Sequence, residues 1–342
     1  MEYRNLGSSG TSVSAYALGT MTFGAEADEK ASHAILDDYA AGGGNFIDTA
    51  DVYSAGVSEE IIGRWLAKSP AAGDMVITTK GRFPMGKGVN DLGLSRRHLR
   101  LALDASLKRL GVEHIDLYQM HSWDPLTPLE ETLGFLHDAV SAGKISYYGF
   151  SNYTGWQLTK AVGIAKARGW DLPVTLQPQY SLLVRGIEPE IVPAALDAGM
   201  GLLPWSPLGG GWLTGKYKRD TAPQGATRLG ENPDRGMEAW KKRNAQEKTW
   251  AIIDVVLATA KARGVSASQV ALAWVAQQPA VTSVILGART TEQLADNLGA
   301  ATLRLTEQET SSLSEVSAPD VADYPYGTPG IEQRSRKIDG GR

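Results

Sequence analysis

Short apolar runs alternate with longer amphipathic stretches along most of the chain. Each apolar run has the length of a strand, and the stretches between the runs are long enough for helices. Strands that alternate with helices indicate a parallel sheet, because consecutive parallel strands need a crossover connection. The predicted strands are Ala15–Gly19, Asn45–Asp48, Met75–Lys80, Ile115–His121, Tyr147–Ser151, Val174–Gln177, Gly201–Trp205 and Val284–Gly287.

These eight units run evenly from end to end, and no change in composition marks a second domain. A closed (β/α)8 barrel, or TIM barrel, fits this spacing better than an open doubly wound sheet. We therefore predict one domain over residues 1–342, with the barrel at about 15–305. Three segments lie outside the alternation: a hairpin in Glu2–Ala17 that caps the bottom of the barrel, a functional loop at Gly209–Asn244 and a tail at 317–342.

Two of the predicted helices have recognisable ends. The stretch Ser95–Leu110 places its apolar residues on one face, with Ser95 as the expected N-cap and Gly111 as the expected stop. The stretch Ser58–Ala67 carries two glutamates in its first turn, where negative charge suits the helix dipole. Ser58 is the expected N-cap of that helix.

Composition excludes several classes of function. The chain has no cysteine, so disulfides, thiolate metal sites and a cysteine nucleophile are ruled out. Its formal net charge of −4 and its lack of a basic tract predict no nucleic-acid partner. The N-terminus is polar and no apolar run reaches membrane-spanning length, so we expect a cytoplasmic protein without a membrane partner. The histidines show no metal-ligand spacing, and no metal is predicted.

Polar residues follow the predicted strands at their carboxyl ends, which is where (β/α)8 barrels place their reactive groups. An apolar strand that ends in a charged residue must solvate or pair that charge. Three successive strands end in Asp48, Lys80 and His121, and together they suggest a converging group. The other polar strand ends are Thr20, Ser151, Asn152, Gln177, Ser206 and Arg289.

Tyr53 follows Asp48 by five residues, and its phenol could reach the mouth of the barrel. A tyrosine titrates near 10, but a lysine about 4 Å away is worth at most roughly 4 kcal/mol at an effective dielectric of about 20. That energy corresponds to about three pKa units, which is enough to bring the phenol near 7. A carboxylate on the far side of the lysine would offset part of this and would keep the lysine protonated. We therefore predict a relay of Asp48, Lys80 and Tyr53 in which Tyr53 is the general acid, with His121 orienting a substrate oxygen.

Five motifs in this order resemble those of the aldo-keto reductases, and the likeness runs from about Tyr3 to Leu305. The resemblance implies an NADP(H)-dependent enzyme that interconverts aldehydes or ketones with alcohols, with Asp48, Tyr53, Lys80 and His121 as its catalytic tetrad. The motifs are Gly44–Tyr53 with Ser58–Glu60 following, Ile77–Gly81, Ile115–His121, Gly143–Ile145 with Gly149–Asn152, and Gln177–Ser181.

The resemblance also implies a site for NADP(H). Its nicotinamide end would be held by Ser151, Asn152 and Gln177 and stacked on Trp205. The pyrophosphate would lie against the segment after Trp205, and the adenosine end against the segment after the last strand, where Asp296 also matches. The complete predicted set is Gly19, Thr20, Met21, Asp48, Ser151, Asn152, Gln177, Trp205, Ser206, Pro207, Leu208, Gly210, Lys216, Arg228, Gly287, Arg289, Gln293 and Asn297.

Physical chemistry supports the adenosine end independently of the resemblance. An arginine fork such as that of Arg289 pairs well with a 2′-phosphate, and a helix start near Thr290 offers free N–H groups. Phe23 and Trp123 follow strand ends, and we expect them to line the substrate pocket with Tyr53 and His121. The expected partner is a small carbonyl or alcohol compound.

Three alternatives stand beside this interpretation. Gly210–Tyr217 is close to a phosphate-binding loop, but Tyr217 stands where such a loop needs serine or threonine. A glycosidase or isomerase would need two acidic strand ends, and Asp48 is the one that fits directly. Some aldo-keto reductases act chiefly as cofactor-sensing subunits of membrane channels, and an assay of NADPH turnover separates that role from catalysis.

Overall fold

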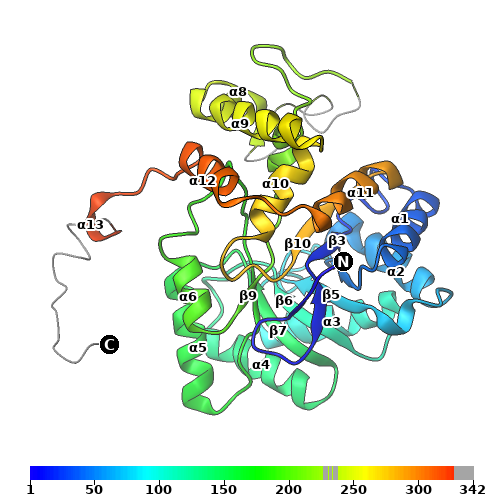
Figure 1. Ribbon diagram of the computed structural model, residues 1–342. Helices are drawn as coiled ribbons and strands as arrows, with labels where there is room; N and C mark the ends of the chain where they lie inside the picture. Colours follow the sequence, from blue (N-terminus) through cyan, green and yellow to red (C-terminus); the bar gives the residue numbers. More distant parts are fainter. Residues whose placement is uncertain (226–229, 231–232, 234–237, 327–342) are drawn as a thin grey trace.

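The computed structural model describes residues 1–225, 230, 233 and 238–326. Eight parallel strands form one curled sheet with helices around its outer face (Figure 1), and the predicted (β/α)8 barrel is confirmed. The strand order is β10-β3-β4-β5-β6-β7-β8-β9. The strands are β3 (Tyr16–Gly19), β4 (Phe46–Asp48), β5 (Val76–Gly81), β6 (Ile115–Met120), β7 (Ile145–Ser151), β8 (Thr175–Gln177), β9 (Gly201–Leu202) and β10 (Val284–Gly287).

The pairing brings the carboxyl ends of the strands to one rim of the barrel. Gly19 pairs with Asp48, and Ser151 at the end of β7 pairs with Gln177 at the end of β8. The backbone N–H of His121, just after β6, donates to the Gly81 carbonyl at the end of β5 (3.1 Å). The polar residues that the sequence places at strand ends therefore face a common space.

The barrel closes along a seam between β9 and β10. Four backbone hydrogen bonds cross it: Leu202 N–H to Ala280 O (2.8 Å), Thr282 N–H and Ser283 N–H to Leu202 O (2.9 and 3.4 Å), and Ile285 N–H to Pro204 O (3.0 Å). The strand predicted at Gly201–Trp205 is shorter in the structure, where β9 covers only Gly201–Leu202. Pro204 interrupts it because proline has no N–H to donate to a ladder.

The predicted N-terminal hairpin is confirmed, with β1 (Tyr3–Asn5) antiparallel to β2 (Ser12–Ser14). Its turn packs closely against the bottom of the barrel: a Cβ on Gly7 would lie 2.0 Å from the Val174 carbonyl oxygen, just before β8. Leu6 and Val13 of the hairpin are buried among the apolar residues that fill the barrel interior. The hairpin therefore plugs the end opposite the rim.

Helices cover the outer face of the sheet, and a larger apolar core lies between them and the strands. The predicted ends of the Ser95–Leu110 helix are confirmed, since Ser95 accepts the His98 N–H and Gly111 adopts a left-handed φ of 67°. The α-helices are α1 (Glu29–Ala41), α2 (Val57–Leu66), α3 (Arg96–Leu110), α4 (Leu129–Ser141), α5 (Gly155–Arg168), α6 (Ile191–Asp197), α8 (Trp240–Asn244), α9 (Glu247–Arg263), α10 (Ala267–Ala276), α11 (Thr291–Leu298), α12 (Glu307–Val316) and α13 (Asp323–Tyr326).

The prediction that Ser58 caps α2 is wrong. The helix begins at Val57, and its N-cap is Gly56, with a left-handed φ of 98°. The Ser58 hydroxyl is buried and donates instead to the Thr20 carbonyl oxygen (3.0 Å). This bond ties the start of α2 to the end of β3, beside the rim.

The described part of the predicted loop at Gly209–Asn244 begins with a 3₁₀ turn, η3 (Gly209–Thr214), and ends with α8. An aromatic cluster fixes this segment: the Trp212 ring stacks on Trp240 with centroids 4.9 Å apart and meets the edges of Tyr217 and Trp250. No helix in the described parts of the chain is long and apolar enough to cross a membrane.

Candidate active site

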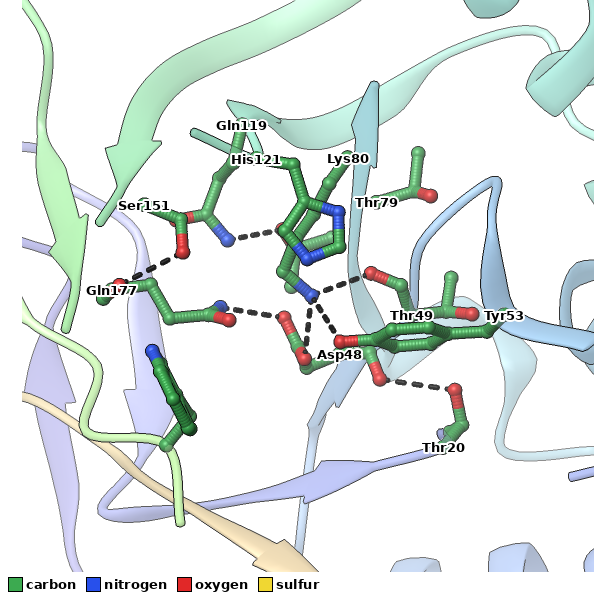
Figure 2. Close-up of polar contacts among 12 residues, drawn as sticks. Thr20, Asp48, Thr49, Tyr53, Thr79, Lys80, Gln119, His121, Ser151 and Gln177 are labelled. Carbon is green, nitrogen blue, oxygen red and sulfur yellow. Dashed lines mark hydrogen bonds and ion pairs between the residues drawn. The ribbon is translucent and has the colours of Figure 1, made fainter. Parts of the chain in front are cut away.

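The buried ammonium group of Lys80, near the end of β5, bonds to groups at and just after the end of β4 (Figure 2). Lys80 Nζ donates to Asp48 Oδ2 (2.8 Å), to the Thr49 carbonyl oxygen (2.8 Å) and to the Tyr53 hydroxyl (3.3 Å). Gln177, from the far side of the barrel, donates to the other Asp48 oxygen (2.8 Å). Lys80 and Asp48 are fully or almost fully buried, so this ion pair is shielded from water.

The Tyr53 phenol is positioned by a turn with unusual backbone geometry. Tyr53 opens the 3₁₀ turn η1 (Tyr53–Gly56), in which Ser54 and Ala55 have left-handed φ values of 48° and 55°. Such values are costly for residues other than glycine, so surrounding contacts must hold the turn. The Ser54 hydroxyl supplies one, because it donates to the Phe23 carbonyl oxygen (2.7 Å).

His121 completes the group from the end of β6. Its ring lies edge-on to the Tyr53 ring, with centroids 5.9 Å apart, and Phe83 packs against its other side at 4.7 Å. Its Nδ1 atom is buried and has no hydrogen-bond partner within the described part of the chain. The predicted convergence of Asp48, Tyr53, Lys80 and His121 is therefore present in the structure.

Burial and charge set the protonation of these groups. Burial raises the Tyr53 pKa above its usual value and Lys80 offsets only part of the rise, so the expected pKa near 7 is wrong. Burial lowers the Lys80 pKa, but Asp48 and Tyr53 outweigh it and the net shift is upward. Burial, with the charges of Lys80 and Arg82, lowers the His121 pKa to about 2. The site thus holds a neutral phenol, a cationic lysine and a neutral imidazole.

A second polar network lies beside Gln177. The Asn152 amide donates to the His121 carbonyl oxygen and to Ser151 Oγ, both at 3.0 Å, and accepts from the Trp205 indole (3.1 Å). Ser151 in turn donates to the Gln177 carbonyl oxygen (2.9 Å). Asn152 has a left-handed φ of 59°, which aims its amide across three strand ends.

A cavity of about 670 Å³ opens beside Tyr53 and His121 and extends past Trp205 to the start of α11. This volume lies within the range of cofactor pockets. Its far end is formed by a helix start, where Thr290 caps α11 and the Arg289 N–H donates to the Gln293 side chain (2.9 Å). The cavity therefore runs from the buried phenol to the N-terminus of α11, with polar side chains along its length.

Comparisons with known proteins agree with this geometry. The model of the aldo/keto reductase family matches residues 16–318, which is most of the chain. The chain belongs to the aldo/keto reductase family. It is 39% identical over 325 residues to the "Uncharacterized oxidoreductase YrpG" of Bacillus subtilis, covering 92% of this chain and 96% of that protein.

Two further relatives of similar length carry different names. The versiconal hemiacetal acetate reductase of Aspergillus parasiticus is 35% identical, over 93% of this chain and 98% of its own. A probable voltage-gated potassium channel subunit beta of rice is 37% identical, over 88% of this chain and 91% of its own. Family membership makes this chain an oxidoreductase that uses a nicotinamide cofactor and acts on small molecules.

Most residues predicted for the site line this aldo/keto reductase cavity. Lys80 does not, because it lies buried behind Tyr53 and Asp48. The lining residues that the sequence had predicted are Gly19, Thr20, Met21, Asp48, Tyr53, His121, Ser151, Asn152, Gln177, Trp205, Ser206, Pro207, Leu208, Gly210, Lys216, Gly287, Arg289, Gln293 and Asn297.

Three other predicted residues do not join them. Phe23 is fully buried in the core between sheet and helices, so its expected place in a substrate pocket is wrong. Trp123 packs edge-on against Tyr153 and Trp156 and lies outside the described lining of the cavity. Arg228 lies outside the described residues.

The cavity also has lining residues that sequence reasoning missed, among them Glu26, Thr214, Ser266 and Ser268. Ser266 is the N-cap of α10, accepts the Gln269 N–H and donates to Asp296 Oδ2 (2.9 Å). A serine before an apolar helical run is a recognisable cap, but the pattern does not reveal that α10 begins against the cavity. Glu26 follows no strand end directly and gave no signal.

Proposed function

We propose that this chain is an NADP(H)-dependent reductase that interconverts aldehydes or ketones with alcohols, with Tyr53 as its general acid and base. The observation that carries the proposal is the hydrogen bond from buried Lys80 to the Tyr53 hydroxyl at the inner end of the cavity. A proton donor at a cavity wall, backed by a fixed cation, is suited to protonating a carbonyl oxygen.

Each residue of the group has a distinct part in this proposal. The Tyr53 hydroxyl gives its proton to the substrate oxygen in reduction and takes it back in oxidation. Lys80 stabilises the phenolate left behind, and Asp48 keeps Lys80 charged. His121, neutral at ordinary pH, hydrogen-bonds the same substrate oxygen without competing as an acid.

The cavity suits a dinucleotide along its length. When bound, the cofactor supplies or accepts the hydride. Ser151, Asn152 and Gln177 offer amide and hydroxyl groups beside Tyr53, which fits a carboxamide. Farther out, Gly211 leaves room for Lys216: a Cβ there would lie 2.6 Å from Lys216 Nζ, so the ammonium approaches the backbone closely. A cation in that position fits a pyrophosphate.

The preference for NADP(H) over NAD(H) rests on Arg289. Arg289 lines the outer end of the cavity, directly before the capped start of α11. A guanidinium beside a helix N-terminus favours a ligand with an additional phosphate.

The test is replacement of Tyr53 with phenylalanine, which removes the proton donor and keeps the ring. General acid catalysis contributes about 10²–10⁴-fold, so turnover of a carbonyl panel with NADPH should fall by at least a hundredfold. Cofactor binding, followed by fluorescence titration, should be largely retained. A Tyr53→Phe enzyme that keeps more than about a tenth of wild-type turnover contradicts the assignment.

The rice relative supports a second candidate, a cofactor-binding subunit of a membrane channel. The two functions differ in rate. A catalyst gives sustained NADPH consumption with some member of a carbonyl panel, whereas a sensing subunit binds NADPH tightly and turns over slowly. The intact Asp48, Tyr53, Lys80 and His121 group favours catalysis.

A further inference from the structure

A buried polar cluster lies behind the candidate active site, on the outer face of β5 and β6 beneath α2 and α3. Thr79 and Lys80 are consecutive in β5, so they leave the strand on opposite sides (Figure 2). On the outer side, Thr79 Oγ1 donates to Glu59 Oε1 (2.5 Å), and Arg109 Nε donates to Glu59 Oε2 (2.7 Å). Glu59 is therefore fully paired.

Two neighbouring groups are not paired. Both carboxyl oxygens of Asp51 and the hydroxyl of Tyr118 are buried and lack a hydrogen-bond partner anywhere in the described residues. The Tyr118 hydroxyl lies against Gly81, where a Cβ would approach it to 2.2 Å. Because buried polar groups are nearly always hydrogen-bonded, an unsatisfied carboxyl group needs a reason to persist.

The charges around Asp51 explain how it is tolerated. Burial raises its pKa to about 7, and the Glu59 carboxylate adds to the rise. The adjacent Val52 N–H, which does not reach hydrogen-bond geometry with the carboxylate, offsets part of it, as do Arg109 and Lys80. Asp51 therefore changes charge within the pH range in which an oxidoreductase is commonly assayed.

Asp51 is coupled to the active site through the chain and through its charge. It lies in the turn between Asp48 and Tyr53, and its N–H donates to the Lys80 carbonyl oxygen (3.1 Å). Its carboxylate raises the pKa of the Tyr53 phenol, as does that of Asp48, whereas Lys80 lowers it. The other titratable groups of the cluster, Glu59, Arg109 and Tyr118, face Asp51 and not the cavity.

We propose that Asp51 is a positioning residue that acts on Tyr53 through its charge: ionised Asp51 holds the phenol in its proton-donating form, and neutral Asp51 releases that restraint. This inference rests on the proposed function, which makes Tyr53 the acid and base. Alcohol oxidation needs the phenolate, so the Asp51 charge moves the onset of oxidation to higher pH. The cluster thus sets, from outside the cavity, the pH at which Tyr53 changes from a proton donor to a proton acceptor.

The test compares wild type with Asp51→Asn in both directions between about pH 6 and about pH 10. In wild type, kcat/KM for alcohol oxidation rises with pH as Tyr53 ionises. Asp51→Asn removes the charge, so the rising limb of this profile should move to lower pH by up to about one unit, the size expected for one nearby charge at an effective dielectric of about 20. The limb, not its midpoint, is compared, because the Tyr53 pKa lies above its usual value. Reduction near pH 6, where Asp51 is already neutral, should change less than about twofold.

Asp116→Asn is a matched control. The Asp116 carboxylate accepts the Ile77 N–H (2.8 Å) at the start of β6, away from the rim. Its removal should leave the oxidation profile in place. If Asp51→Asn does not fold, Asp51→Ser removes the same charge with a smaller side chain, and the displacement of the same rising limb is measured.

Profiles of the Asp51 variants that overlay wild type, or that move to higher pH, overturn the inference. So does an Asp116→Asn shift of equal size, because the effect is then not specific to this cluster. Activity of Tyr53→Phe separates the two proposals. If that variant is active, the proposed function fails; if it is inactive and the Asp51 profiles overlay, only the role of Asp51 fails.

Discussion

Replacing Lys80 with methionine tests the central ion pair, because methionine keeps the unbranched shape and removes the ammonium group. The change leaves the buried Asp48 carboxylate with the Gln177 amide as its remaining described side-chain donor, and it deprives the Thr49 carbonyl oxygen of its Nζ donor. Removing one partner of a buried ion pair costs about 3–5 kcal/mol. We expect a loss of that size in the free energy of unfolding, measured by urea denaturation.

Turnover should fall as well, for a separate reason. Without Lys80, burial still raises the Tyr53 pKa but nothing comparable offsets it, so the phenolate formed in reduction is no longer stabilised. We expect a loss of about 10²-fold or more in kcat near neutral pH. Fluorescence titration with NADPH shows whether cofactor binding persists, which separates a chemical defect from a misfolded pocket.

Asp48→Asn is the matched control. It leaves Lys80 bonded to Thr49 and Tyr53, so it should reduce turnover less than Lys80→Met. The double variant removes both charges and should recover part of the stability lost in Lys80→Met, since no buried charge is left unpaired. A Lys80→Met protein within about 1 kcal/mol of wild type, or an Asp48→Asn enzyme that is the slower of the two, refutes the relay.

Three further outcomes can be measured on the same protein. Arg289→Ala should weaken NADPH binding about ten- to a hundredfold and leave NADH nearly unchanged, because a charge-assisted hydrogen bond is worth about 1.5–3 kcal/mol; equal losses in a fluorescence titration contradict the phosphate role. Gly63→Ala should lower the unfolding free energy by about 1–3 kcal/mol, since its Cβ would lie 2.4 Å from the Arg109 carbonyl oxygen; an unchanged urea midpoint contradicts the close packing of α2 on α3. Asp51 binds its proton more tightly folded than unfolded, with a pKa of about 7 against 3.8, so this contribution to stability is present below about pH 4 and should be lost by about pH 7, up to roughly 4 kcal/mol. Asp51→Asn should remove that dependence, and an equal pH dependence in both proteins excludes it.

Much of the fold could be predicted because its signals are local. Serine before a helical pattern and glycine after it marked the ends of α3, and alternating apolar runs marked the strands. Parallel strands share one direction, so the carboxyl ends of the predicted strands lie at one rim. The sequence therefore also predicted that Asp48, Lys80 and His121 lie close together.

What the sequence could not supply depends on contacts between distant segments. Phe23 follows a strand end, which is also where residues that line a pocket occur in the sequence. The loop nevertheless places its side chain in the core. Ser58 has the pattern of a cap, yet its hydroxyl serves the Thr20 carbonyl instead. The direction of the Tyr53 pKa shift depends on burial, which spacing does not reveal, and the unpaired state of Asp51 depends on what surrounds it in three dimensions.

The seam between β9 and β10 is a place where the proposed ligand would stabilise the closed barrel. The barrel is closed at this point by a few backbone hydrogen bonds and not by a regular ladder, and the chain after each of the two strands lines the cavity: Trp205 to Leu208 after β9, and Gly287 to Arg289 after β10. A dinucleotide that contacts both segments would link β9 and β10 across the seam. Saturating cofactor would then slow amide exchange most along this seam, and the barrel would be least tightly closed when its nucleotide has left.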